Sequence, residues 1–430
     1  MKALSSILHP LRGLARKRFV RDVATVAGGT AAAQAISFAF YPIITRLYGP
    51  EAFGTLGVFM SVLAVLASIA GLAYPIAIVL PKSDEDARGL VRLSLAIAVI
   101  VASAAALILV AFSAPIISLL GLELIAPFVF LLPLVVLFTT LLATVEQWLI
   151  RTGQFALIAR MAVLQALVVN GVKAALGLVL PLASVLIATS IAGVALHAGM
   201  LELGRRWNGH YRQNPFPAEP KKSASDLVRT YRDFPLFRAP QELLNSLSHG
   251  LPVILLAAFY GSTVVGFYTL AYSFLAAPVT LVGRSVGNVL YPRLAEAANR
   301  GQDLRRLVVL PTAALLLTGI IPFGAVMIAG PRLFAFVFGA QWQEAGEYAR
   351  WLSLWIIFGF ANIPSVKAAP VINKQNFLLI YGVISLIFRV LSVYISYILS
   401  FTPVDTMIFI GLSGAVANII LIYIIYLKIK

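Results

Sequence analysis

Residues 90–113 read LVRLSLAIAVIVASAAALILVAFS and contain a single charged residue, Arg92. A helix rises ~1.5 Å per residue, so a run of this length can cross the ~30 Å hydrocarbon core of a bilayer. The sequence predicts twelve such spans and therefore an all-α polytopic membrane protein with about twelve transmembrane helices. The predicted spans are Val23–Leu47, Phe53–Leu80, Leu90–Ser113, Leu124–Leu149, Phe155–Leu180, Leu182–Leu203, Phe234–Tyr260, Val264–Tyr291, Leu307–Ala329, Arg350–Val371, Phe377–Phe401 and Val404–Leu427.

Most of the 33 Lys and Arg residues lie in every second loop between these spans. The opposite loops hold only Arg46, Arg332 and Arg350. Because cytoplasmic loops carry an excess of Lys and Arg, this alternation predicts that both termini are cytoplasmic. Residues 1–22 are basic and lack the apolar region and cleavage site of a signal peptide, so we interpret them as a cytoplasmic interfacial segment.

The composition excludes several classes of protein. With 60% hydrophobic residues, 12% charged residues and a mean hydropathy of +0.93, a water-soluble domain of this length is excluded. Cytoplasmic loops that face anionic headgroups explain the formal charge of +16, so we expect no nucleic-acid partner. The chain has no Cys, its four His residues are scattered, and it has no nucleotide-binding motif. We therefore expect no metal and no other cofactor.

A short motif recurs with the same spacing in both halves of the chain. Residues 48–54 (YGPEAFG) recur as residues 260–266 (YGSTVVG), at an offset of 212 residues. This repetition indicates a tandem duplication. We expect an N-terminal six-helix lobe (23–204), a cytoplasmic linker rich in Pro, Lys and Arg (205–233) and a C-terminal six-helix lobe (234–430). Two lobes with the same orientation are expected to place a substrate path at their interface.

Polar residues recur at helical spacing in spans 1, 7, 8 and 11. Arg389 is the deepest of the charged residues, and an Arg at the centre of a span costs about 2.5–3.5 kcal/mol against lipid. We therefore expect Arg389 to face protein or water. The candidates for lining a substrate path are Arg46, Lys173, Arg238, Arg284, Arg389, Gln34, Gln241, Asn245, His249 and Asn288.

Other interpretations of these residues stay open. Snorkelling toward the membrane surface competes with a cavity position for Arg284 and Lys173. His249 is better explained as a helix–helix hydrogen-bonding group than as a metal ligand, because no second ligand lies at metal spacing. A bond to a neighbouring helix is an equally good explanation for three amides: Gln34, Gln241 and Asn245.

The distribution of the acidic residues favours an anionic substrate. No Asp or Glu lies at mid-membrane, and only Glu146 and Glu242 lie appreciably inside a span, both on the cytosolic side. A cation or proton pathway normally contains a buried carboxylate, whereas a cavity with Arg and Lys and no acid suits an anion. A diphosphate fits because it accepts bidentate guanidinium bonds.

Four stretches of the chain carry a resemblance to a known family: RLYGPEAFG (46–54), WLIRTGQF (148–155), FYGSTVVGFY (259–268) and LYPRL (290–294). Together they resemble the Wzx-type flippases of lipid-linked oligosaccharides, in the multidrug/oligosaccharidyl-lipid/polysaccharide exporter (MOP) superfamily. The resemblance implies a V-shaped pair of six-helix bundles around a cationic central cavity lined mainly by spans 1, 2, 7 and 8. It also implies that an undecaprenyl-diphosphate-linked glycan moves from the inner to the outer leaflet of the bacterial inner membrane.

This resemblance favours a transporter that breaks no bond and works by alternating access. An ion-coupled drug exporter of the same superfamily is an alternative, which the missing mid-membrane carboxylate disfavours. A polysaccharide polymerase or ligase is less favoured, because it should have a large outer loop and the outer loops here are short. A purely structural membrane scaffold gives no reason for a deep Arg. The partners implied are the lipid-linked glycan, membrane lipid, and a polymerase and chain-length regulator of the same pathway.

Overall fold

The computed structural model describes residues 2–207, 223–372 and 374–429, with the side chains of residues 2–24, 284, 288 and 375 left outside the description. All regular elements in these ranges are helices. In order they are α1 (Lys2–Leu47), α2 (Pro50–Ala70), α3 (Tyr74–Ala77), α4 (Asp84–Leu120), η1 (Glu123–Leu131), α5 (Leu132–Arg151), α6 (Phe155–Gly177), α7 (Ala183–Trp207), α8 (Ala224–Thr230), η2 (Phe234–Arg238), α9 (Ala239–Tyr260), α10 (Ser262–Asn299), α11 (Arg305–Phe338), η3 (Ala340–Trp342), α12 (Gln343–Ala361), α13 (Ile363–Val371), α14 (Gln375–Ile398) and α15 (Pro403–Lys428).

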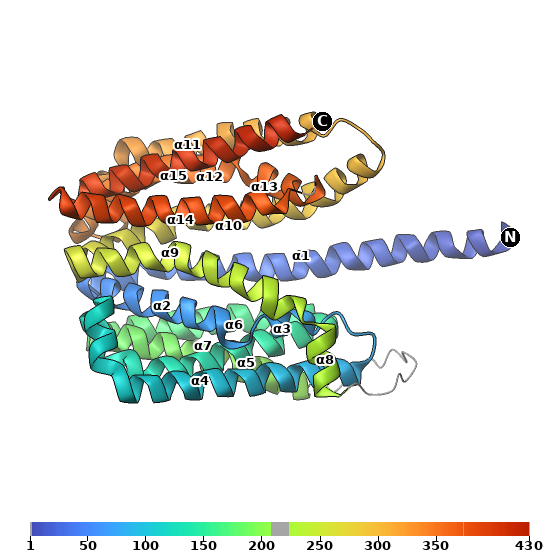
Figure 1. The fold of residues 1–430 in the computed structure, drawn as a ribbon, viewed down its shortest axis with the longest axis horizontal. Helices are drawn as coiled ribbons and strands as arrows, with labels where there is room; N and C mark the ends of the chain where they lie inside the picture. The colour runs from blue at the N-terminus through green and yellow to red at the C-terminus, as the bar shows by residue number, and fades with distance from the viewer. Residues whose placement is uncertain (1, 208–222, 373, 430) are drawn as a thin grey trace.

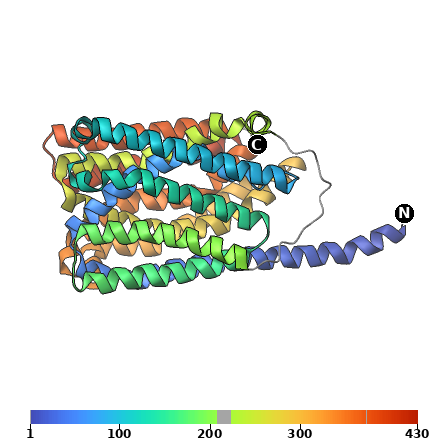
Figure 2. The same cartoon turned by 90° about the horizontal axis from the view of Figure 1, so that it is seen from below.

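Eleven helical segments in the described ranges are long and apolar enough to cross a membrane, which supports a multi-pass membrane protein. The expectation of about twelve spans is therefore met by eleven. The expected span Val23–Leu47 forms part of α1 but is not among the eleven, and its first two residues lie outside the part of the chain whose side chains the structure describes. The backbone of the basic N-terminal segment continues α1 along its own axis, away from the bundle (Figures 1 and 2).

Proline sets several helix boundaries that the apolar runs do not reveal. The expected span Leu124–Leu149 is built from the 3-10 helix η1 followed by α5, with Pro133 in the first turn of α5. The expected span Arg350–Val371 breaks at Asn362, and Pro364 lies in the first turn of α13. Proline is tolerated there because first-turn N–H groups have no partner within the helix.

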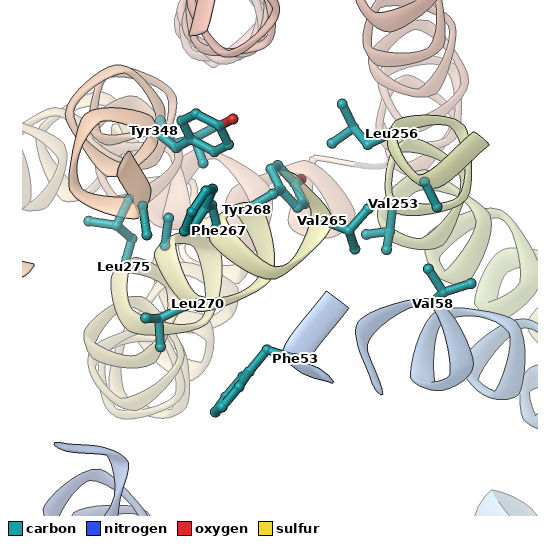
Figure 3. Close-up of a cluster of buried hydrophobic side chains, with 14 of the residues drawn as sticks. Phe53, Val58, Val253, Leu256, Val265, Phe267, Tyr268, Leu270, Leu275 and Tyr348 are labelled. Atoms are coloured by element: carbon teal, nitrogen blue, oxygen red, sulfur yellow. The ribbon is translucent and has the colours of Figure 1, made fainter. Parts of the chain in front are cut away.

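The helices lie roughly parallel in two layers, α2 to α7 on one side and α10 to α15 on the other, with α1 and α9 along the seam (Figure 1). Both termini lie at one end of the bundle, called here the terminal end (Figure 1). Across the seam, the closest packing joins α2 to α9 and α10. Figure 3 shows side chains from both layers in this core, including Phe53 and Val58 of α2 and Phe267 of α10.

The two copies of the repeated motif pack against each other across the seam. A Cβ atom on Gly54 would collide with the carbonyl oxygen of Ser262, and one on Gly266 would collide with the carbonyl oxygen of Pro50. The contact is reciprocal, because Pro50 and Gly54 correspond to Ser262 and Gly266 at the offset of 212 residues. Such a contact is expected for packing about a local two-fold axis, and only glycine lets the two backbones approach this closely.

Further contacts join the layers at the end opposite the termini. The side chains of Gln341 and Trp342 donate to the carbonyl oxygen of Thr45 at 2.7 and 2.8 Å. The hydroxyl of Thr45 donates to the carbonyl oxygen of Phe338 at 3.1 Å. The fully buried Trp342 ring also meets the Phe53 ring edge-on, with centroids 5.1 Å apart. These contacts hold the bundle closed at this end.

Candidate functional site

A polar cavity of about 370 Å³ lies between α9, α13 and α14. It gathers the sequence candidates of spans 7 and 11, because residues three and four apart on a helix share one face. All of its lining residues come from the C-terminal half of the chain, so it does not lie between the two halves. They are Arg238, Gln241, Glu242, Leu244, Asn245, Ser248, His249, Val366, Leu378, Leu379, Tyr381, Gly382, Ser385 and Arg389.

Arg389 is the deepest charge in this cavity, with only 7% of its surface exposed. Its Nη1 donates to both the carbonyl oxygen and the hydroxyl of Ser248 at 2.8 Å. Its guanidinium carbon lies 4.3 Å from the centroid of the Trp355 ring. Its Nε is buried without a partner, and no acidic side chain of the described residues forms an ion pair with it. The guanidinium is therefore positioned by neutral groups and keeps its full positive charge.

An ion pair lies at the start of α9. Arg238 Nη2 contacts Glu242 Oε1 at 2.7 Å, and Arg238 Nη1 donates to Gln241 Oε1 at 3.1 Å. Both charged side chains are partly exposed, at 45% and 36%. Glu242 is thus a carboxylate of the cavity wall that the sequence does not single out as a site residue. Its i,i+4 spacing to Arg238 was the available signal.

His249 connects the cavity to the helices around it. Its Nδ1 lies 3.1 Å from the hydroxyl of Tyr272 on α10. The Tyr272 ring stacks on Trp355, with centroids 5.5 Å apart, and Trp355 in turn contacts Arg389. This geometry agrees with the helix–helix hydrogen bond proposed for His249. Sequence reasoning missed Trp355, because span 10 shows no polar periodicity.

The remaining candidates lie elsewhere. Arg46, in the last turn of α1 at the end opposite the termini, donates to the carbonyl oxygen of Phe336 at 2.9 Å. Lys173 is half-buried on α6, and its carbonyl oxygen accepts from the hydroxyl of Tyr48 at 2.9 Å. Gln34 on α1 has a buried Oε1 without a partner. The side chains of Arg284 and Asn288 lie outside the described part of the structure.

A second cavity, of about 380 Å³, is almost entirely apolar and lies between α1, α10 and α11. Its walls include Phe38 of α1, Phe274 and Pro278 of α10, and Phe323 of α11. It therefore has residues of both halves of the chain in its walls, unlike the polar cavity. In the described ranges, no group of three or more His, Asp or Glu residues could hold a metal ion.

Long apolar helices with a polar cavity among them are typical of a multi-pass membrane transporter. The family described as "Polysaccharide biosynthesis protein" matches residues 19–298, and the chain belongs to this family. The resemblance seen in the sequence motifs is thereby confirmed. The family match and the transport relative described next agree with a Wzx-like membrane transporter.

The relatives agree with this assignment. The chain is 24% identical over 314 residues to the succinoglycan biosynthesis transport protein ExoT of Rhizobium meliloti (strain 1021). That match covers 72% of this chain and only 60% of ExoT. Two solved structures share the fold: the lipid II flippase MurJ in an inward closed conformation (TM-score 0.70, 14% identity, 92% of this chain and 86% of MurJ) and a multidrug resistance MATE family transporter in an inward-facing conformation (TM-score 0.68, 14% identity, 93% and 98%).

Proposed function

We propose that this protein moves an undecaprenyl-diphosphate-linked oligosaccharide from the cytoplasmic to the outer leaflet of the bacterial inner membrane. The observation that carries the proposal is Arg389, a nearly buried guanidinium held by Ser248 and Trp355, with no acidic partner among the described residues. A diphosphate is a suitable occupant, because charge-assisted guanidinium bonds strengthen where water is partly excluded. Membership of a polysaccharide-biosynthesis family supports a glycan as the cargo.

The two cavities suggest how one amphipathic molecule is accommodated. The diphosphate and first sugars occupy the polar cavity beside Arg389. The isoprenoid tail stays in lipid and passes by the apolar cavity between α1 and α10, where the two halves meet. The contacts around Thr45 and Gly54 close the end opposite the termini. With both termini in the cytoplasm, the described state receives substrate from the cytoplasmic leaflet.

Transport then requires alternating access. In this proposal two six-helix lobes (23–204 and 234–430), joined by the cytoplasmic linker 205–233, rock about the seam and form a V-shaped pair. Residues 208–222 of the linker lie outside the described part of the structure. The following α8 starts with a capping box at Ser223 and buries Leu227 against Gly89 of α4. A polysaccharide polymerase and a chain-length regulator are the proposed partners.

The test is transport of a fluorescent undecaprenyl-diphosphate glycan in proteoliposomes. Arg389→Ala is expected to reduce transport ten-fold or more, because a charge-assisted bond to a desolvated anion is worth about 1.5–3 kcal/mol. Arg389→Lys should fall between Ala and the parent, since it keeps the charge and loses the planar fork. Equal transport by all three proteins, at matched reconstitution, would refute the diphosphate role of Arg389.

The same vesicles test the main alternative, an ion-coupled drug exporter. The fold shared with a MATE family transporter is the reason to test it. Cationic dyes are the matched probe, because their charge is opposite to that of a diphosphate. Dye transport that Arg389→Ala leaves intact, with no transport of the lipid-linked glycan by the parent, would replace the flippase by an exporter.

A further inference from the structure

A third cavity, of about 250 Å³, lies between α4, α5 and α7 and shares no lining residue with the polar cavity. Three of its lining residues are arginines: Arg88 and Arg92 of α4 and Arg205 of α7. It contains no residue of the C-terminal half, so the proposed transport path does not include it. The first turns of α4 and the last turns of α7 lie at the terminal end of the bundle (Figures 1 and 2).

The charge around this cavity is positive and partly fixed in place. Arg88 and Arg92 are four residues apart, so they share one face of α4, and both are exposed. Across the cavity, Glu202 holds Arg205 with two bonds, from Nε at 2.7 Å and Nη2 at 2.6 Å. Glu202 also pairs with Arg206 at 2.8 Å. The lining thus holds three arginines and one carboxylate, Glu202.

The floor and the flank of the cavity are mainly apolar, apart from the Thr144 hydroxyl, which donates to the carbonyl oxygen of Thr140. Trp148, Val145 and Thr144 of α5 are buried beneath the arginines. Beyond Arg92, the same face of α4 continues through Ala96 to Val99, both exposed, with 53% of Val99 accessible. A small soluble anion gains nothing from this apolar stripe. A molecule with an anionic head and a hydrocarbon tail can use both parts.

We propose that this cavity binds the phosphate headgroup of an anionic glycerophospholipid, with the acyl chains along the exposed stripe of α4. Basic pockets between transmembrane helices on the cytoplasmic side suit such headgroups, and Arg and Trp fit the headgroup level of a bilayer. Guanidinium groups from two helices can share the phosphate oxygens, so the lipid bridges α4 and α7 across α5. The site needs the terminal end to be cytoplasmic but is independent of what the protein transports.

The test is native mass spectrometry of the full-length protein in neutral detergent, with dioleoyl-phosphatidylglycerol or dioleoyl-phosphatidylcholine added. The parent should retain phosphatidylglycerol in preference to phosphatidylcholine. Arg88→Gln/Arg92→Gln should weaken phosphatidylglycerol retention about ten-fold. The charge-matched control is Arg160→Gln/Arg293→Gln, which removes two exposed arginines outside the cavity and should retain lipid as the parent does.

A melting experiment protects the test against a variant that is merely less stable. Phosphatidylglycerol should raise the Tm of the parent and of the control. In Arg88→Gln/Arg92→Gln this rise in Tm should be largely lost, whatever the Tm of that variant without lipid. Equal phosphatidylglycerol retention and equal Tm increments in the cavity variant and the control would overturn the proposal. Displacement of phosphatidylglycerol by undecaprenyl diphosphate in the parent, but not in the cavity variant, would assign the cavity to the transported lipid and also overturn it.

Arg389→Ala separates this site from the proposed function. It should leave phosphatidylglycerol retention unchanged, even where it stops transport. Loss of retention in that variant would mean that the bound lipid lies at the polar cavity, against the proposal.

Discussion

At the residue scale, Arg389 shows how a deep charge is held by neutral groups, with no ion pair in the part of the chain that the structure describes. The two bonds to Ser248 and the Trp355 ring replace part of the hydration of the guanidinium, and the remaining N–H groups stay available for a ligand. A carboxylate partner would have neutralised the site. Neutral partners position the charge and leave its field intact, which is the arrangement that capture of an anion requires.

Trp355 is expected to position Arg389 rather than to contact substrate. Trp355→Leu removes a cation–π contact worth ~0.5–2 kcal/mol. Transport of the lipid-linked glycan should fall several-fold, less than in Arg389→Ala, through a higher KM. Trp207→Leu is the control, because 92% of that side chain is exposed. Identical transport kinetics of Trp355→Leu and Trp207→Leu would show that the ring does not hold Arg389 in place.

Glu242 is expected to compete with the substrate for Arg238. In Glu242→Gln the repulsion of a diphosphate is removed and Arg238 is released, so the KM for the lipid-linked glycan should fall two- to five-fold, in line with ~0.2–1 kcal/mol for an exposed pair. Glu296→Gln is a matched control, because Glu296 forms the same i,i+4 pair with Arg300 outside the cavity. An unchanged or higher KM in Glu242→Gln would argue against an anion near Arg238.

At the element scale, the crossing of α2 and α10 depends on two glycines that face backbone atoms. Neither carbonyl group can rotate away as a side chain can, so an added methyl group must push the helices apart. In a helix interior without such contacts, the same change is favourable by ~0.5–1 kcal/mol, because alanine loses less conformational freedom than glycine. The sign of a Gly→Ala effect therefore reports whether the crossing is present.

Gly54→Ala and Gly266→Ala are each expected to lower the Tm of the purified protein, as overpacking costs ~1–3 kcal/mol. Gly199→Ala should raise or preserve the Tm, because a Cβ atom on Gly199 meets no atom within 4 Å. The measurement is thermal unfolding in detergent followed by intrinsic fluorescence. A Tm of Gly54→Ala at or above that of Gly199→Ala would be incompatible with the crossing.

The sequence predicted the elements better than their partners. Span positions follow from apolar runs, which are local, and eleven segments carry that signal. The first span, Val23–Leu47, begins at residues whose side chains the structure does not describe, and it is not among the eleven. The pairing of α9 with α14 was out of reach, because a polar periodicity marks one face of each helix but not the helix that packs against it. Trp355 of α12 was missed because span 10 shows no polar periodicity. The hydrogen bond from Arg46 to Phe336 also joins segments far apart in sequence. No local pattern reveals such a bond, so from the sequence alone Arg46 is a candidate for lining the substrate path.

At the scale of the whole molecule, one end of the bundle is tied together while the polar cavity lies within the C-terminal half. The contacts at that end are the hydrogen bonds that join Thr45 to Phe338 and Trp342, and the close packing of α2 on α10 at Gly54 and Gly266. For a headgroup bound beside Arg389 to leave at that end, these contacts have to separate. The seam is therefore expected to be the moving part, and its strength to set how often the outer side opens.

Cysteine labelling in right-side-out vesicles can measure that opening, because the chain has no Cys of its own. Three positions are each replaced by Cys. Ser262 is half-buried in the seam, Ser400 is exposed between α14 and α15, and Asn299 is the last residue of α10, at the terminal end of the bundle. A membrane-impermeant maleimide should label position 400 readily, position 262 slowly and position 299 not at all. Labelling at 299 without labelling at 400 would invert the proposed orientation.

Adding Gly266→Ala to the Ser262→Cys protein should then raise the labelling rate at position 262 several-fold, because a weaker crossing opens the seam more often. The rate at position 400 should stay constant, since that loop takes no part in the crossing. A change of ~1 kcal/mol in the free-energy difference between the closed and the open seam changes the opening equilibrium about five-fold. Labelling rates are precise enough to detect a change of that size. If Gly266→Ala lowers the Tm yet leaves labelling at 262 unchanged, the crossing stabilises the fold without controlling access, and the gate lies elsewhere in the bundle.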